Sequence, residues 1–179
     1  MVIKMKLQTK QKIADSIRPF HLPRYEEIPD SGMYLEQTAK YICEFLNPVL
    51  GNAITTSMIS NYVKKDLIDN PVKKQYYREQ IAYLIFIAIA KNVMSLDGLI
   101  NFIALQKRTY DLRKAYDYFC DQFEVTLFYT AEVTDTMDIV GEDTADEKKL
   151  LFSCIVAVTQ KIYLEKCLEA IVAEETEEK

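Results

Sequence analysis

The chain has 179 residues, 49% of them hydrophobic, which is enough for one domain with a core, alone or with an appendage. It contains only four glycines and five prolines, and every proline lies at or before Pro71, which disfavours a turn-rich β-sandwich or β-barrel. The net charge of −5 divides into +5 over residues 1–110 and −10 over residues 111–179, which indicates either separate roles for the two halves or merely different solvated surfaces.

Several kinds of site are disfavoured by residue counts. No two glycines lie closer than 19 positions, so there is no glycine-rich phosphate loop, and a single histidine, His21, provides no histidine metal site. The four cysteines are too far apart for a zinc framework, and with no secretory leader the thiols are expected to be reduced in the cytoplasm. The longest apolar run, Ile81 to Ala90, is too short for a membrane span. We expect no metal, no cofactor, no membrane contact and no enzymatic activity.

The first 30 residues are expected to form an N-terminal arm. Residues 6–17 fit either a short helix or a loose arm, and the connector that follows contains Pro19, Pro23 and Pro29, which prevent regular structure. The first clear amphipathic helix spans residues 34–46, because Leu35, Ala39, Ile42 and Leu46 recur at helical spacing, and Pro48 and Gly51 are expected to end it.

A second helix is expected over residues 55–65, with Thr55 as its N-cap, and residues 66–71 break it. Residues 72–77 are expected to be a short basic extended segment, a small hairpin or wing. The run 81–90 is apolar on every side and predicts a fully buried helix. Ser95 and Asp111 each cap a further helix, residues 134–143 form an acidic linker, and a long helix runs from Asp146 to about Ala173.

The expected fold is therefore all-α, with six or seven helices and at most a two-stranded wing. We divide the chain into an N-terminal arm (1–30), a middle domain that contains the short wing (31–110) and a C-terminal helical segment with an acidic tail (111–179).

The helix over residues 55–65 has two distinct faces. Met58, Ile59, Tyr62 and Val63 collect on one side. The opposite face carries hydroxyls, an amide and ammonium groups but no carboxylate: Thr56, Ser57, Ser60, Asn61, Lys64 and, at its edge, Lys65. Such groups can bond base edges and phosphates in a major groove, although an ordinary solvated helix face has the same pattern.

The segment after this helix adds cations and aromatic side chains: Lys73, Lys74, Tyr76, Tyr77 and Arg78. A basic extended segment of this kind suits a wing that lies along a phosphate backbone. The other interpretation is a solubilising surface loop whose tyrosines pack on the core.

The order of these segments resembles the winged helix of MerR-like regulators. The resemblance rests on Ile59-Ser60-Asn61-Tyr62-Val63-Lys64-Lys65-Asp66-Leu67-Ile68, Tyr76-Tyr77-Arg78-Glu79-Gln80-Ile81-Ala82-Tyr83-Leu84 and Ser95-Leu96-Asp97-Gly98-Leu99-Ile100. More narrowly, the chain is similar to the bacterial YkrK-like family, labelled domain of unknown function 1836, over about residues 20–108. That similarity rests on Leu22-Pro23-Arg24-Tyr25, Met33-Tyr34-Leu35-Glu36-Gln37, Thr56 to Lys65 and Pro71-Val72-Lys73-Lys74.

The resemblance implies that residues 31–110 are a winged helix-turn-helix DNA-binding domain and that the protein is a DNA-binding regulator. The sequence departs from the MerR type in three places: no Arg precedes Tyr62, Asp66 replaces the turn glycine, and Lys73, Lys74 and Arg78 stand only loosely for the wing arginine. The operator and the promoter mechanism therefore do not carry over.

In residues 111–179, the last helix and the aromatic residues each allow two interpretations. The last helix has apolar residues at spacings of three and four from Leu151 to Ile171, which fits a dimer contact or a helix packed on its own chain. The aromatic residues between Tyr110 and Tyr129 fit an effector pocket or plain core.

The sequence thus predicts a DNA-binding transcriptional regulator that binds double-stranded DNA as a homodimer, with no effector assigned. Lys64, Lys65, Lys73, Lys74 and Arg78 are expected to bind phosphates, with Tyr76 beside them. Thr56, Ser57, Ser60 and Asn61 are expected to meet base edges. The alternative is a helical protein–protein interaction module, an adaptor or anti-regulator, that no longer binds DNA.

Overall fold

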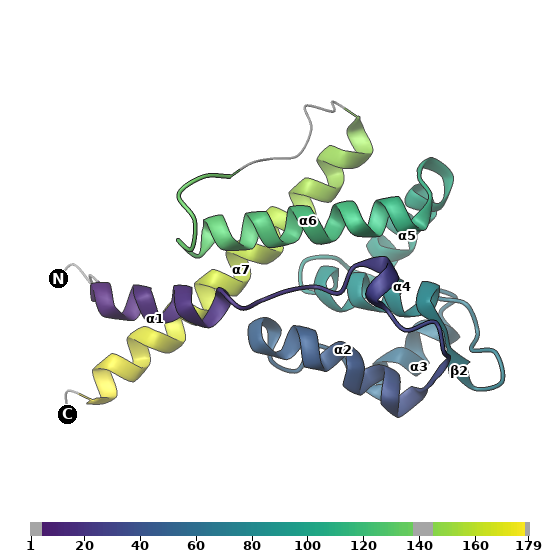
Figure 1. Ribbon diagram of the computed structural model, residues 1–179, viewed down its shortest axis with the longest axis horizontal. Helices are drawn as coiled ribbons and strands as arrows, with labels where there is room; N and C mark the ends of the chain where they lie inside the picture. Colours follow the sequence, from purple (N-terminus) through teal and green to yellow (C-terminus); the bar gives the residue numbers. More distant parts are fainter. Residues whose placement is uncertain (1–4, 138–144, 178–179) are drawn as a thin grey trace.

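The computed structural model describes residues 5–137 and 145–177 and confirms a mostly helical fold (Figure 1). Over these residues it contains seven α-helices, one 3-10 turn and one two-stranded sheet. In chain order they are α1 (Leu7–Ile17), η1 (Tyr25–Glu27), β1 (Met33–Tyr34), α2 (Leu35–Leu50), α3 (Thr56–Lys64), β2 (Gln75–Tyr76), α4 (Arg78–Ala90), α5 (Leu96–Thr109), α6 (Leu112–Thr130) and α7 (Asp146–Glu177).

The predicted helix starts are confirmed by side-chain caps. The Thr55 hydroxyl accepts a hydrogen bond from the Met58 backbone N–H at 3.2 Å, and Ser95 and Asp111 accept equivalent bonds at the starts of α5 and α6. Each cap satisfies a backbone donor that the first helical turn leaves unpaired.

The predicted end of the first amphipathic helix is confirmed at Gly51 and is wrong at Pro48. Pro48 lies inside the last turn of α2, and the helix ends at Gly51, whose φ is 62°. A proline in the final turn removes only one hydrogen bond, whereas Gly51 adopts the positive φ that ends a helix without a steric penalty.

Helix α4 is the centre of the core. Ten of its 13 residues are buried, and it packs against α2, α6 and α7. A single cluster of buried side chains runs from Ile13 in α1 to Ile162 in α7. The three expected parts of the chain, 1–30, 31–110 and 111–179, therefore share one core.

The long helix α7 packs on its own chain over part of its length only. Cys154, Ile155, Val158 and Ile162 are buried, mainly between α6 and α7. Further along, Leu164, Leu168 and Val172 are 57%, 54% and 62% exposed. We call these three side chains the α7 stripe. Of the predicted linker 134–143, residues 138–143 lie outside the described residues.

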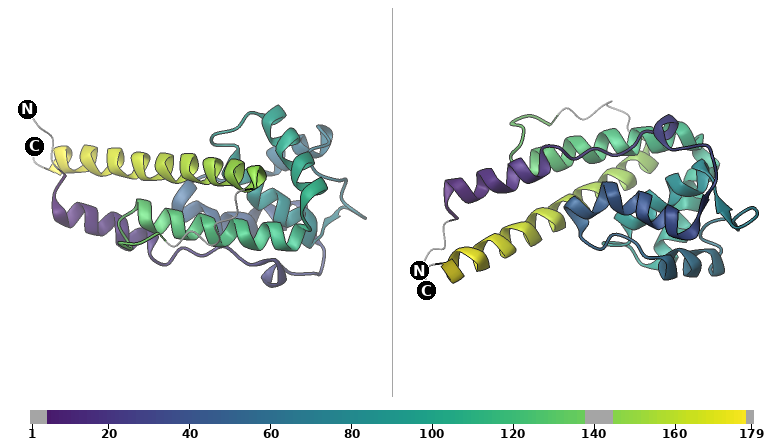
Figure 2. Two further views of the ribbon diagram at one scale, coloured as in Figure 1. Left: turned by 90° about the horizontal axis from the view of Figure 1, so that it is seen from above. Right: turned by 60° about the horizontal axis from the view of Figure 1, so that its bottom comes forward.

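The N-terminal arm is not loose. α1 lies beside the far part of α7, at the end of the molecule opposite β2 (Figure 2). The Thr9 hydroxyl donates a hydrogen bond to the Glu174 carboxylate, and the Lys10 ammonium lies 2.9 Å from Glu132. Residues 6–17 therefore take the helical alternative.

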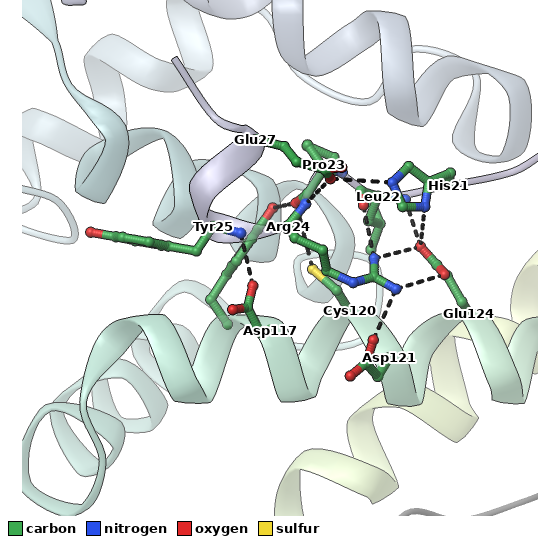
Figure 3. Close-up of polar contacts among 11 residues, drawn as sticks. His21, Leu22, Pro23, Arg24, Tyr25, Glu27, Asp117, Cys120, Asp121 and Glu124 are labelled. Atoms are coloured by element: carbon green, nitrogen blue, oxygen red, sulfur yellow. Dashed lines mark hydrogen bonds and ion pairs between the residues drawn. The ribbon is translucent and has the colours of Figure 1, made fainter. Parts of the chain in front are cut away.

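The connector after α1 is held on α6 by a polar cluster (Figure 3). The Arg24 guanidinium donates to both carboxylate oxygens of Glu124, at 2.8 and 2.9 Å, and lies 2.9 Å from Asp121. The same guanidinium donates to the Leu22 carbonyl at 2.8 Å. The hydrogen bond to Glu124 raises the pKa of Arg24 above its ordinary value. This cluster fixes the connector to a helix 100 residues further along the chain.

The sheet pairs two segments that are far apart in the sequence. Met33 pairs with Tyr76 and Tyr34 with Gln75 in antiparallel register. The backbone before β1 lies so close to β2 that a Cβ atom on Gly32 would stand 2.8 Å from Gln75 Cβ and 2.9 Å from Tyr77 Cζ. Gly32 therefore permits this close approach.

Gly32→Ala is expected to lower the free energy of unfolding by about 1–2 kcal/mol, because the added methyl overpacks the sheet junction. Gly98→Ala is the matched control, since its Cβ would lie 3.3 Å from its nearest neighbour and alanine favours the helix. Urea denaturation followed by circular dichroism measures both variants. Equal stability of the Gly32 variant and the parent protein would contradict the close approach.

Candidate nucleic-acid interface

Helix α3 presents the predicted polar face to solvent. Ile59 and Tyr62 are buried, and burial raises the pKa of the Tyr62 hydroxyl. On the opposite face, Ser57, Asn61 and Lys64 are exposed, and Thr56 and Ser60 are partly exposed. Lys65, the C-cap residue, is exposed as well. The amphipathic pattern thus orients the hydroxyls, the amide and the two ammonium groups outward.

The basic segment after α3 forms a tight hairpin, Val72 to Gln75, which we call the lysine turn. The Val72 N–H donates to the Gln75 carbonyl at 3.0 Å, and the Gln75 N–H donates back at 2.9 Å. Lys73 and Lys74 are the two residues at the tip, and both are exposed. Because Gln75 and Tyr76 pair with β1, the turn is anchored at its base.

The tip of the lysine turn has an unfavourable backbone conformation for its sequence. The φ angles of Lys73 and Lys74 are 50° and 66°, as a two-residue type I′ turn requires. Asn-Gly or Asp-Gly is the usual choice for such a turn, because side chains with a Cβ clash in the left-handed region. Two consecutive lysines are therefore an unusual choice of residues for this turn.

The four lysines of α3 and the lysine turn keep their charges available. Among the described residues, Lys64, Lys65, Lys73 and Lys74 form no salt bridge. An external anion can bind them without breaking an internal ion pair. The acidic residue nearest in sequence is Asp66, which follows the C-cap of α3 and has a φ of 53°. This is the position at which the family resemblance implied a glycine.

Two residues that were predicted to contact DNA, Tyr76 and Arg78, instead pack against their own chain. Tyr76 is 4% exposed, packed in the core below the sheet, and burial raises the pKa of its hydroxyl. Arg78 donates to the Ile28 carbonyl at 2.8 Å, pairs with Glu26 at 2.9 Å and lies over the Tyr25 ring. Both side chains serve internal packing, because residues of the connector cover the start of α4.

The remaining candidates lie on two elements, α3 and the lysine turn. We call Thr56, Ser57, Ser60, Asn61, Lys64, Lys65, Lys73 and Lys74 the polar–lysine surface. α3 and the projecting hairpin that contains the lysine turn lie at the same end of the molecule, remote from the far part of α7 (Figure 2). This surface therefore combines a polar helix face with a cationic projection.

The comparisons with known proteins give one match, to a protein family. None of the described helices combines the length and the apolar character needed to cross a membrane. No curated protein and no solved structure matches the chain. The profile of the family described as "Domain of unknown function (DUF1836)" matches residues 23–119, from the connector through α3 and the lysine turn to the middle of α6. Because this match covers more than half of the chain, the protein belongs to the DUF1836 family.

Proposed function

We propose that the protein is a DNA-binding transcriptional regulator that uses α2, α3, the lysine turn and α4 as a MerR-like winged helix-turn-helix. The observation that carries the proposal is the polar–lysine surface: an acid-free helix face and an anchored lysine turn at the same end of the molecule (Figure 2), with four lysines that form no salt bridge among the described residues. In such an arrangement α3 lies in the major groove and the turn lies along the phosphate backbone.

The residues of the polar–lysine surface belong to two chemical groups, cations and neutral polar side chains. Lys64, Lys65, Lys73 and Lys74 neutralise phosphates, which contributes affinity that depends on salt concentration but not on sequence. Thr56, Ser57, Ser60 and Asn61 can form hydrogen bonds with base edges, and an asparagine amide can bond an adenine through two atoms. The left-handed φ of Asp66 supports the proposal, because a sharp turn follows α3 as the MerR-like order requires.

The proposed regulator acts as a homodimer, because a single winged helix buries too little DNA to be selective. The α7 stripe supports a contact between two copies: Leu164, Leu168 and Val172 recur every four residues on one exposed face. The strongly acidic back half, residues 111–179, repels DNA. Electrostatics therefore favours an approach in which the basic front half faces the duplex.

Two substitutions on α3 test the site. Lys64→Ala is expected to weaken binding to every duplex and to lower the slope of log K against log salt by about one unit. Asn61→Ala is expected to weaken binding to the preferred site by about 1–3 kcal/mol and to relax base choice at one position. Fluorescence anisotropy with duplexes selected from random DNA, at several salt concentrations, measures both effects.

Lys12→Ala is the control, because it removes the same charge from the exposed side of α1. It should leave both the slope and the base preference as in the parent protein. If Lys64→Ala and Lys12→Ala have the same effect, the assignment of α3 is wrong.

The alternative function is a helical protein–protein module without DNA binding. The α7 stripe favours it, because exposed apolar residues in register can also receive a partner protein. A titration with mixed duplex DNA at low salt separates the two functions, since a DNA-binding protein shows non-specific affinity under these conditions. No binding at low salt would favour the protein–protein module.

A further inference from the structure

Lys91 lies beside α3 although it belongs to another part of the chain. It is the C-cap residue of α4, and its ammonium donates a hydrogen bond to the Met58 sulfur at 3.4 Å. Met58 belongs to the first turn of α3 and is exposed. The sequence does not link the two residues, because they are 33 positions apart. The fold thus adds a cation at the N-terminal end of α3.

The charge of Lys91 is not neutralised by an anion of the chain. Among the described residues, its ammonium forms no salt bridge. The Met58 sulfur is an uncharged, weak acceptor, and an ammonium group has further donors for a second partner. Burial lowers the pKa of Lys91 below its ordinary value, because the charged form loses hydration. An external anion would therefore replace part of the hydration that folding removed.

The end of α4 does not need Lys91 as its cap. The Asn92 side-chain amide donates to the Ala88 carbonyl at 3.1 Å and to the Ile89 carbonyl at 2.8 Å. These bonds satisfy carbonyls that the last helical turn leaves unpaired. Lys91 also follows directly on a buried helix, so its backbone is held in place. Its side chain therefore loses less freedom on binding an anion than one on a loose loop would.

Lys91 and Lys64 place ammonium groups at opposite ends of α3. Met58, which Lys91 contacts, and Lys64 are six positions apart, or about 9 Å along a helix axis. Asn61 lies between them and is exposed. The major groove of B-form DNA is about 12 Å wide, with one phosphate backbone on each side. A helix that crosses such a groove approaches one backbone near each of its ends.

We propose that Lys91 binds a backbone phosphate of duplex DNA at the N-terminal end of α3, while Lys64 and Lys65 bind the backbone of the other strand at the C-terminal end. This inference rests on the proposed DNA function. Phosphate contacts fix the register of a protein on the duplex. Ser57 and Asn61 then lie between two such contacts, which holds them against the base edges. A single strand supplies only one of the two backbones.

The first test replaces Lys91 by methionine, which keeps an unbranched side chain but removes the charge. Lys91→Met is expected to lower the slope of log K against log salt by about 0.9, and the affinity for duplex DNA about threefold to tenfold near 0.1 M salt. Lys91→Arg keeps the charge and should restore the parental slope. The urea midpoint of Lys91→Met should not fall, because the lost charge is partly desolvated.

Acetylation of the lysines in the whole parent protein locates the contact without a substitution. With mixed duplex DNA at low salt, Lys91 and Lys64 should react less with acetic anhydride, as mass spectrometry of the peptides measures. Lys12, which is exposed on α1, should react equally with and without DNA and is the control.

The results separate this inference from the proposed function. If the parent protein has no affinity for duplex DNA at low salt, both are overturned. If the parent protein binds DNA and Lys64→Ala lowers the salt slope, but Lys91→Met does not, only the role of Lys91 is wrong. Equal acetylation of Lys91 with and without bound DNA leads to the same conclusion.

Discussion

The double substitution Lys73→Asn and Lys74→Gly is expected to make the protein more stable and, at the same time, to weaken its binding to DNA. Asn and Gly suit the positive φ of the lysine turn, so the free energy of unfolding should rise by about 1–2 kcal/mol. Two lost phosphate contacts should lower the salt slope by about 1.8 and the affinity by about 10- to 100-fold near 0.1 M salt. Urea denaturation and DNA anisotropy titrations measure the two quantities on the same preparation.

The matched control carries Lys12→Asn and Lys149→Asn, which change the net charge equally at exposed positions outside the polar–lysine surface. It should keep both the stability and the salt slope close to those of the parent protein. A variant of the turn that gains stability but binds DNA as before would show that the strained lysines have another role. A loss of stability would contradict the turn geometry.

Arg24→Ala is expected to lower the free energy of unfolding by about 3 kcal/mol, because it leaves a largely buried carboxylate without its guanidinium, and only the Leu22 N–H and His21 remain beside it. Glu124 is only 13% exposed and receives both donors of the guanidinium. Arg24→Lys keeps the charge but not the paired geometry, and we expect about half of that loss. Guanidinium denaturation at pH 7 measures both variants.

Arg113→Ala is the control for this pair. Arg113 also forms an ion pair, with Glu26 at 2.8 Å, but its side chain is 57% exposed. Exposed pairs contribute about 0–1 kcal/mol, so this variant should change stability little. If Arg24→Ala and Arg113→Ala lower the free energy of unfolding by the same amount, the connector is not held on α6 through Glu124.

The helices could be predicted from the sequence because their signals are local. Thr55, Ser95 and Asp111 each stand three residues before the backbone donor that they cap. The run 81–90 has no polar side, and it became the buried helix α4. Helix ends were less predictable: Pro48 is a strong local signal, yet packing extends α2 through it to Gly51.

The contacts between distant segments could not be predicted from one sequence. β1 has only two residues, and its partner β2 lies more than 40 positions away. Arg24 and Glu124 meet across 100 positions without a motif that links them. The same limit explains the errors at Tyr76 and Arg78, because connector residues that cover the start of α4 cannot be recognised from local composition.

The candidate surface was predicted in part. The face of α3 follows from helical periodicity, and Ser57, Asn61 and Lys64 are exposed as expected. The type I′ geometry at Lys73 and Lys74 contradicts the usual residue preference, so no turn rule would have indicated it.

One hydrogen bond has a consequence for the DNA sites that such a regulator could use. The Lys166 ammonium of α7 donates to the Pro48 carbonyl at the end of α2, at 3.2 Å, and α7 also packs on α4. α7 thus packs directly on α4, and α4 packs on α2, which contacts α3. A dimer joined through the α7 stripe would hold its two α3 helices at one fixed separation. Its operators would then tolerate only a single distance between half-sites.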